Sequence, residues 1–411
     1  MMDIFLFIII CISSIVFSRI ILGSWLSPVS AFVSIWGILV ILYQFGLSEY
    51  LVKLNHSTYI LLDVMILSFV LAFALGKTIV FRLSDAKVEN DDVISIVLIK
   101  RMFVVWLALS AVEVVVSGGI PIVWSLLGSS KTYFDFGIPS LHGFLNGFAQ
   151  VIACLAFYLI ITKCRSKKGA ASIIVFIYMY FIMIVTRQVI ITLSMELLFI
   201  YIFIKKNIKV SQVIAIVMGS TLVFGILGNI RTGYESFIEV SRLNVTIPAA
   251  FSGVLWVYMY LVMTLANINN LVLCPDLKIH ASTVFSELIP NAISNLFNES
   301  SAIQQDRQYM STLLVTPNYN VSGYFRDYYA WCNIGGVILI ASVYGLIGGI
   351  TYRLYKTSHN ERNCILYSIS LCIITLSFFF DMLTYLPVSI QFIITILIFY
   401  KNKRRFVLRD V

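Results

Sequence analysis

Residues 228–235 read GNIRTGYE and close an apolar run that begins at Val213. Arg231 lies in this segment and Arg242 follows it, although charged side chains are costly at the level of lipid tails. The organisation of the chain therefore depends on which side of a membrane this segment faces and on what its arginines could hold.

The composition of the chain indicates that lipid is its solvent. Of the 411 residues, 60% are hydrophobic and only 12% are charged, with a mean hydropathy of +0.94. A soluble protein of this size cannot bury so much apolar surface. The net charge is +9, but the basic residues lie beside apolar runs, which indicates membrane orientation and argues against nucleic-acid binding. The first run, Ile4–Leu22, has no basic leader and no cleavage site, so we expect a retained helix.

Apolar runs that are long enough, or nearly long enough, to cross a bilayer recur along the whole chain. They are Ile4–Leu22, Val29–Leu47, Tyr59–Phe81, Met102–Val116, Phe144–Thr162, Ala170–Thr186, Val189–Ile204, Val213–Ile230, Ala249–Val272, Gly335–Tyr352, Cys364–Phe380 and Leu386–Tyr400. The runs predict an all-α polytopic membrane protein that forms one integral membrane domain over residues 1–411.

Lysine and arginine in the loops predict the orientation of these runs. Basic clusters after residues 162, 204 and 352 and in the C-terminal tail are expected to be cytoplasmic, which places the N-terminus outside and the C-terminus inside. The outer side then holds the loop 117–141 and a large region, 229–333. Because both ends of that region are external, we expect the run 249–272 to be re-entrant or to lie along the membrane surface. The alternative is a crossing whose return lies within 281–297, and the total is about eleven spans, with a range of about ten to twelve.

Arginines on the predicted outer side are candidates for binding an anion, because the guanidinium group matches phosphate oxygens better than the lysine ammonium does. Arg187 sits between two apolar runs with almost no loop, so it lies near the membrane surface, where contact with lipid headgroups is its alternative role. Arg231 and Arg242 are eleven residues apart, which on a continuous helix gives nearly the same face about 16 Å along the axis. That shared face requires the helix to continue past Gly233.

Three other outer residues could act as an acid or a base. His142 lies at the outer start of the predicted helix 144–162, where it could bind substrate, accept a proton or cap the helix. Asp135 and Asp327 are external acids that could serve as a general base, and an ordinary solvated carboxylate is the alternative for each.

Two pairs of side chains raise the question of a partner. Glu113 and Glu196 lie inside apolar runs, where acids are costly, and Glu196 is expected to pair with another helix. Cys274 and Cys332 flank a long loop and could form a disulfide if it faces an oxidising space. The chain has no Walker loop, no H-E-x-x-H, no D-x-D pair outside and no Cys/His metal spacing, so we expect chemistry without a metal or cofactor.

Four segments carry a resemblance to a known family. They are YFDFGIPSLHGFLN at 133–146, TRQ at 186–188, GNIR at 228–231 and RDYY at 326–329, the last leading into Gly335 and Gly336. Over most of its length the chain resembles the Wzy-type polymerases of oligosaccharide repeat units, which build O-antigen and capsular polysaccharide.

This resemblance implies a GT-C-like, inverting glycosyltransferase in the inner membrane of a bacterium. Such an enzyme takes undecaprenyl-pyrophosphate-linked oligosaccharides on the outer face and transfers the growing chain to a new repeat unit. Its partners are this lipid-linked donor and acceptor, the bilayer and, in the same pathway, a flippase and a chain-length regulator.

The reaction assigns roles to the outer residues. The leaving pyrophosphate develops charge and needs fixed cations. The candidates are Arg187, Arg231, Arg242 and Arg326. The attacking hydroxyl needs a base or an orienting group. The candidates are His142, Asp135 and Asp327.

Two alternatives stay open. An O-antigen ligase would use the same lipid donor on a similar fold, but the segment 137–146 favours the polymerase. A flippase or transporter of lipid-linked oligosaccharides would carry internal repeats and a charged path across the membrane. The charge in this chain gathers on one predicted face, which favours chemistry at the surface.

Overall fold

The computed structural model describes residues 2–22, 27–79, 94–162, 167–205, 234–245, 248, 252–274, 278–286 and 300–407. Within these ranges the structure is helical and contains no strand, and Ser48 and Leu243 form one isolated bridge. Each predicted apolar run that falls inside them coincides with a helix. The run 213–230 and Arg231 lie outside the described residues.

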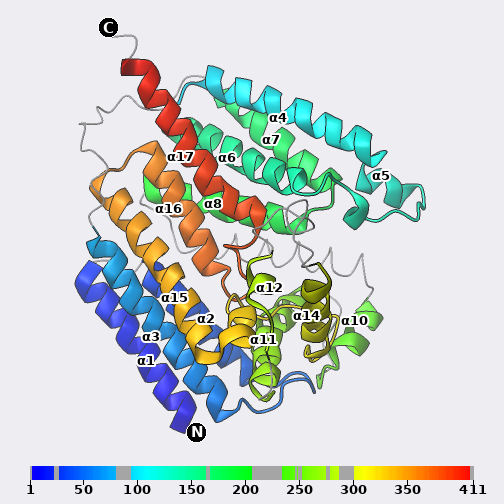
Figure 1. Cartoon of the computed structure of the whole chain (residues 1–411), viewed down its shortest axis with the longest axis vertical. Helices are drawn as coiled ribbons and strands as arrows, with labels where there is room; N and C mark the ends of the chain where they lie inside the picture. Colours follow the sequence, from blue (N-terminus) through cyan, green and yellow to red (C-terminus); the bar gives the residue numbers. More distant parts are fainter. Residues whose placement is uncertain are drawn as a thin grey trace.

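The helices follow the chain in the order shown by Figure 1. They are α1 (Met2–Leu22), α2 (Pro28–Tyr43), α3 (His56–Thr78), α4 (Ile96–Ser117), α5 (Pro121–Leu126), α6 (Leu141–Thr162), α7 (Lys167–Met183), α8 (Arg187–Lys205), α10 (Tyr234–Ser241), α11 (Ser252–Val272), α12 (Ala281–Phe285), α14 (Ser300–Thr312), α15 (Arg326–Thr357), α16 (Glu361–Thr375) and α17 (Leu386–Val407), with a short 3-10 helix at Tyr133–Asp135. Seven helical segments in the described part are long and apolar enough to cross a membrane. The chain is therefore a polytopic helical membrane protein, and the count of about eleven spans stays a prediction.

Local sequence explains where several helices begin. Side-chain oxygens of Ser27, Asn55, Ser95 and Asn360 accept hydrogen bonds from backbone N–H groups in the first turns of α2, α3, α4 and α16. These bonds satisfy donors that have no partner inside the helix. At its other end, α4 stops at Gly118, whose φ of 74° suits the left-handed cap that glycine adopts without strain.

The helices form two groups joined by α16. One group contains α1, α2, α3 and α15, and the other contains α4, α6, α7, α8 and α17 (Figure 1). The helix α16 packs against α2 and α15 on one side and against α6, α8 and α17 on the other. A single apolar core runs through both groups.

The helices α3 and α15 pack backbone to backbone. A Cβ atom on Gly345 would lie 2.4 Å from the backbone oxygen of Phe69, and one on Gly349 would lie 2.3 Å from that of Phe73. From the facing helix, a Cβ atom on Gly76 would lie 2.6 Å from the backbone oxygen of Leu346. Glycines four residues apart allow membrane helices to touch backbone to backbone, where dispersion replaces the hydrophobic effect as the main attraction.

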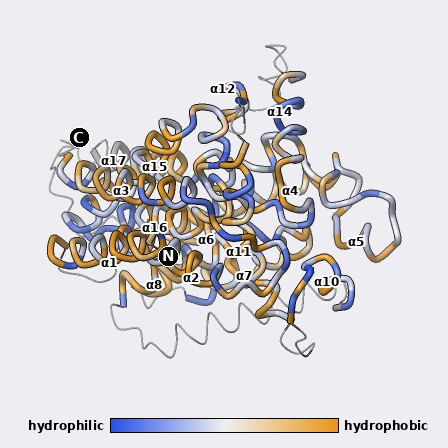
Figure 2. Tube along the Cα trace, turned by 90° about the horizontal axis from the view of Figure 1, so that it is seen from below, coloured by the Kyte–Doolittle hydropathy of each residue, from blue (hydrophilic) through white to orange (hydrophobic). Residues whose placement is uncertain are grey.

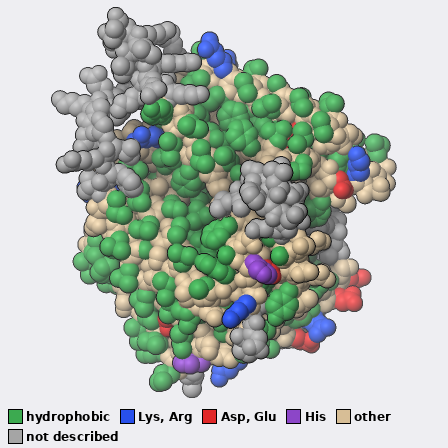
Figure 3. Space-filling view, in the orientation of Figure 1, with side chains coloured by type: hydrophobic (Ala, Val, Ile, Leu, Met, Phe, Trp, Pro, Cys, Tyr) green, Lys and Arg blue, Asp and Glu red, His purple; other side chains and the backbone are tan. Residues whose placement is uncertain are grey.

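The outer faces of the helices suit contact with lipid. On α1 and α4, Ile20 and Val115 are 76% and 78% exposed. Hydrophobic side chains dominate the face in Figure 3, and charged groups lie mainly at its margins and over the region of α10 to α14. Figure 2 shows the same division along the trace, with orange dominant on α1, α3 and α15. An exposed apolar surface of this extent indicates a lipid environment.

The run expected to be re-entrant forms one continuous helix, α11. The Tyr258 hydroxyl accepts from the Leu47 N–H at 3.3 Å, and Asn269 Oδ1 accepts from the Asn55 N–H at 2.8 Å. Leu47 and Asn55 both belong to the connection between α2 and α3, so these two positions of α11 lie at the same end of that helix pair. The same helix also packs against α2 and α3 themselves, so these bonds do not decide between a crossing and a surface position. Since α11 is also long and apolar enough to cross, its orientation stays a prediction.

The contact between α3 and α15 can be tested with Gly345→Ala. The added methyl group should force the two backbones apart and lower the free energy of unfolding by about 1–3 kcal/mol, the usual effect of overpacking. Thermal unfolding of the purified protein in detergent, followed by tryptophan fluorescence, measures the change. Gly37→Ala is the control, because the nearest atom to its Cβ would be 3.9 Å away. Equal unfolding temperatures for both variants and the unchanged protein would show that the contact is loose.

Candidate functional site

A polar cavity of about 410 Å³ lies between the starts of α8 and α15, the helices α12 and α14, and the connection from α16 to α17. We call it the charged cavity, because two arginines and two aspartates line it. They are Arg307, Arg326, Asp327 and Asp381. Its size is in the range of ordinary ligand sites.

Two buried donors on the cavity wall have no hydrogen-bond partner among the described residues. They are the amide Nε2 of Gln188 and the hydroxyl of Tyr324. A buried polar group without a partner costs free energy, so such groups usually meet water or a ligand. Both residues belong to the cavity wall, and a polar ligand there is one way to supply the missing partners.

The first turns of α15 bring Arg326 and Asp327 to this cavity. Behind them, Cys332 and Asn333 leave helical geometry, and the helix continues beyond the kink. A Cβ atom on Gly336 would lie 2.0 Å from the backbone oxygen of Tyr328, so glycine is required where the chain folds against its own first turns. The glycine-containing segment therefore sets the direction in which these charged residues point.

The arginines are held from α14 and its neighbours. The guanidinium group of Arg326 donates to the backbone oxygen of Met310, near the end of α14. Arg307, which is on α14, donates from Nη2 to the hydroxyl of Ser286 at 3.0 Å and is otherwise exposed. Each arginine thus keeps donors that these bonds do not use.

Asp381 is the acid that the sequence did not reveal as a site residue. Its Oδ2 accepts from the Tyr328 hydroxyl at 2.9 Å, and its Oδ1 accepts from the Tyr344 hydroxyl at 2.7 Å and from the Leu383 N–H at 3.0 Å. Enclosure by protein raises the pKa of Asp381 to about 6, although these three hydrogen bonds partly oppose the shift. Its isolation between the apolar runs 364–380 and 386–400 was the signal in the sequence, because a lone acid in so short a connection is expensive.

The arginines predicted to bind pyrophosphate do not all meet. Arg326 lines the cavity, and Arg187 is a half-buried neighbour of the lining residue Gln188. The shared helical face predicted for Arg231 and Arg242 required one helix to include both residues. Arg242 lies outside it, because α10 stops at Ser241 and Arg242 has a left-handed φ of 42°. Its guanidinium carbon lies 5.4 Å from the ring centre of Tyr50, away from the cavity lining.

Asp135 serves the local structure of its loop. Its Oδ2 accepts from the Thr132 N–H at 2.7 Å and from the Thr132 hydroxyl at 3.0 Å. Both bonds hold the pKa of the carboxyl below its usual value, and the bond from the backbone N–H contributes more. An exposed carboxylate that is stabilised in this way is a weak base, and it does not line the charged cavity.

His142 belongs to a separate cluster. Its Nδ1 lies 3.1 Å from Oε1 of the fully buried Glu113, and its Nε2 lies 3.0 Å from the amide nitrogen of Asn146. The tautomer with its proton on Nδ1 donates to Glu113 and accepts from Asn146 at Nε2, so both ring nitrogens already have partners. A Cβ atom on Gly143 would lie 2.9 Å from the side chain of Leu386. Because Leu386 directly follows Tyr385, which lines the charged cavity, the His142 cluster lies close to that cavity.

The remaining partner questions have clear answers. Glu196 pairs across helices as expected: it accepts from Gln391 Nε2 at 3.1 Å on α17 and contacts Cys154 Sγ at 3.6 Å on α6. Cys274 and Cys332 are both free thiols, so the disulfide considered from their spacing is not formed. Within the described ranges, no group of three or more His, Cys, Asp or Glu side chains could hold a metal ion.

The chain was compared with protein-family models, with curated proteins and with solved structures, and none of them matches. The family resemblance therefore stays a prediction.

The raised pKa of Asp381 predicts a pH-dependent stability. The pKa of Asp381 is about 6 in the folded protein and 3.8 for an unperturbed aspartate, which stands for the unfolded state. Between pH 3.8 and pH 6, the folded state therefore binds a proton that the unfolded state releases. The contribution of this group to the free energy of unfolding should fall as the pH rises through that window, by at most about 3 kcal/mol. Asp381→Asn should remove the slope, measured as the difference in unfolding temperature from the unchanged protein at pH 4 and pH 7.

Asp135→Asn is the matched control for this measurement. The pKa of Asp135 is lowered by its hydrogen bonds, so its contribution to stability should instead be lost as the pH falls. A difference for Asp381→Asn that stays constant across the pH range would contradict the assignment.

Proposed function

We propose that this chain is a membrane glycosyltransferase that polymerises undecaprenyl-pyrophosphate-linked oligosaccharide repeat units. The observation that carries the proposal is the charged cavity, where two arginines and two aspartates line one space at the end of a bundle of apolar helices. A lipid-linked pyrophosphate needs such a combination, since its anionic group must be neutralised beside the hydrocarbon that anchors it.

Two arginines of the cavity are suited to hold the leaving group. As the glycosidic carbon separates from pyrophosphate, negative charge develops on the phosphate oxygens and fixed cations stabilise it. Arg307 and Arg326 reach the cavity from two different helices, so they can contact two sides of one diphosphate. Arg187 is adjacent in sequence to the lining residue Gln188 and supplies a third positive charge nearby.

Asp381 is the residue that we assign as the general base. A pKa of about 6 lies near physiological pH, where a base combines availability with driving force. Its Oδ2 accepts only one hydrogen bond within the described residues and has room for a sugar hydroxyl. His142 is less suited, because both of its nitrogens are engaged by Glu113 and Asn146.

The step follows from this arrangement. The acceptor hydroxyl gives its proton to the Asp381 carboxylate while its oxygen forms a bond to the anomeric carbon of the donor sugar. The bond from that carbon to the pyrophosphate oxygen breaks, and its electron pair leaves with undecaprenyl pyrophosphate, held by the arginines. Attack opposite to the leaving group inverts the anomeric carbon.

The predicted orientation puts this chemistry on the outer side of a bacterial inner membrane. Asn267 Nδ2 donates to the Tyr319 oxygen at 2.9 Å, and Asn269 on the same helix accepts from Asn55. These bonds tie the segment that leads into α15 to the connection between α2 and α3, which the loop charges predict to be external. The family resemblance adds a flippase that delivers repeat units and a chain-length regulator as partners in the same pathway.

Arg307→Gln tests the proposed role of the cavity cations. In a strain that depends on this chain for its polysaccharide, the variant should make much less polymer. The rate should fall by about a hundredfold, the usual effect of removing one donor that stabilises the developing charge. The measurement is the gel profile of surface glycan, in which polymer should give way to single repeat units. Lys278→Gln is the charge-matched control, because Lys278 is an exposed cation close to α12 and outside the cavity lining.

The same profile separates the alternatives. A strain that lacks the chain should show single repeat units on the cell surface if the chain is a polymerase. Complete polymer still attached to its lipid carrier would identify a ligase, and repeat units retained inside the cell would identify a flippase. Normal polymer in the Arg307→Gln strain would remove the cavity from the proposal.

The assignment of the base makes a prediction about pH. Asp381→Asn should reduce the rate by about 10²–10⁴. Tyr328→Phe removes a hydrogen bond that lowers the pKa of Asp381, so the rise of rate with pH should move to higher pH. Membranes supplied with lipid-linked repeat units allow the rate to be measured from pH 5 to 8. Tyr329→Phe is the control, since no contact joins its hydroxyl to Asp381. A pH midpoint that shifts only in His142→Gln would assign the role of general base to His142.

A further inference from the structure

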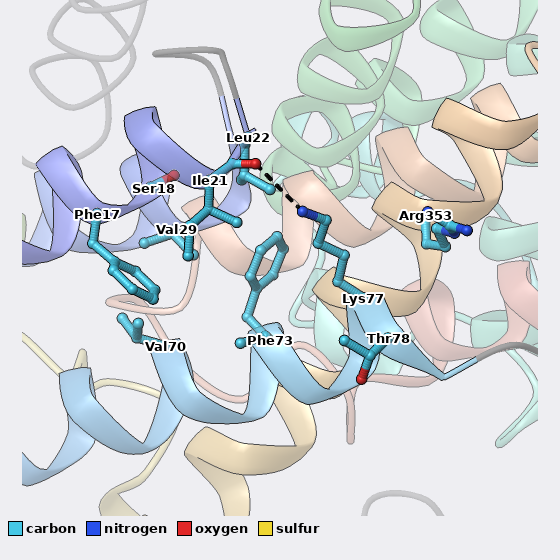
Figure 4. Close-up of a pocket in the computed structure, with 11 residues that line it drawn as sticks. Phe17, Ser18, Ile21, Leu22, Val29, Val70, Phe73, Lys77, Thr78 and Arg353 are labelled. Atoms are coloured by element: carbon cyan, nitrogen blue, oxygen red, sulfur yellow. Dashed lines mark hydrogen bonds between the residues drawn. The ribbon is translucent and has the colours of Figure 1, made fainter.

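A second cavity, of about 440 Å³, lies at the other end of α15, between the ends of α1 and α3 and the start of α2 (Figure 4). We call it the cationic groove. Most of its wall is apolar, and the side chains that matter for binding come from four helices, α1, α2, α3 and α15. They are Phe17, Val29, Val70, Phe73, Lys77 and Arg353.

The polar and apolar parts of the groove are separated. In Figure 4, Phe17 and Val70 lie toward one end, and Lys77 and Arg353 lie toward the other. Among the described residues, no aspartate or glutamate lines the cavity. Lys77 makes one weak contact, from Nζ to the backbone oxygen of Ile21 at 3.5 Å, and no ion pair to it is found within the described residues. The groove thus offers positive charge at one end and an apolar surface at the other.

Its position matches the interface between lipid headgroups and tails. Lys77 lies in the last turn of α3, and Arg353 lies near the end of α15. Both helices are long and apolar enough to span a membrane, so these residues sit where a span meets the headgroup region. Loop charges predict this side to be cytoplasmic, opposite to the charged cavity.

We propose that the cationic groove binds an anionic phospholipid. The phosphate would lie against Lys77 and Arg353, and one acyl chain would cover Phe17, Val70 and Phe73. A basic pocket between membrane helices favours an anionic headgroup over a zwitterionic one. The apolar wall favours a lipid over a free phosphate, because burial of an acyl chain contributes free energy for each methylene group that leaves water. This site is independent of the proposed glycosyltransferase activity.

The test uses the full-length protein, purified in detergent and stripped of lipid. Phosphatidylglycerol and phosphatidylcholine with the same acyl chains are titrated, and intact complexes are counted by native mass spectrometry. Each cation near an anionic headgroup should favour phosphatidylglycerol by about fivefold, or about twenty- to thirtyfold for the pair. Lys77→Gln combined with Arg353→Gln should bring the two affinities together.

The matched control is Lys356→Gln. Lys356 is on the same helix as Arg353, with its Nζ 5.6 Å from the ring centre of Tyr352, and it does not line the groove. This variant should keep the preference for phosphatidylglycerol. An unchanged preference in the double variant, or an equal loss in the control, would overturn the proposal.

Two further measurements separate a lipid site from other binding. Ala74→Phe places an aromatic ring on the groove wall while both cations remain, so it should weaken both lipids. Soluble glycerol phosphate should not displace phosphatidylglycerol at equal concentration. Full displacement would show a phosphate site without a lipid component, and unchanged lipid binding in a folded Ala74→Phe protein would place the lipid elsewhere.

Discussion

The contact between α3 and α15 is the constraint on which the rest of the structure depends. Gly345 and Gly349 let the two backbones touch, so α15 has little freedom to slide or turn against α3. One end of the fixed helix carries Arg326 to the charged cavity, and the other carries Arg353 to the cationic groove. The close helix pair therefore positions Arg353 directly, whereas the kink at Cys332 and Asn333 sets how Arg326 meets the charged cavity.

Three of the enclosed acids have partners of the same kind. Glu113 meets His142, Glu196 meets Gln391, and Asp381 meets two tyrosine hydroxyls, in each case through a side chain from another helix. In a low-dielectric interior each acid needs such a partner, and the partner restricts how the helices pack. Asp381 differs from the other two because it also faces a cavity. That exposure separates the acid that we propose as the base from acids that only join helices.

The sequence predicted part of the candidate site. Arg326 and Asp327 were singled out as charged residues on the predicted outer side, in a segment that carries the family resemblance, and both line the charged cavity. Asp381 was missed, since its partners Tyr328 and Tyr344 are distant in the chain and no local pattern connects them. Arg242 was misplaced because the end of α10 depends on one residue with a left-handed φ, which hydropathy does not indicate.

The sequence by itself determined that the fold consists of apolar helices in lipid. Backbone groups inside a bilayer must bond within their own segment, so a long apolar run has little choice but to be helical. Only the tertiary structure decided which charged side chains share a space, because that depends on how helices far apart in the chain pack together. The segment 228–235 illustrates the limit, since its sequence marks the end of an apolar run and the arginine beside it. The cavity that holds the other cations is built from α8, α12, α14, α15 and the connection before α17.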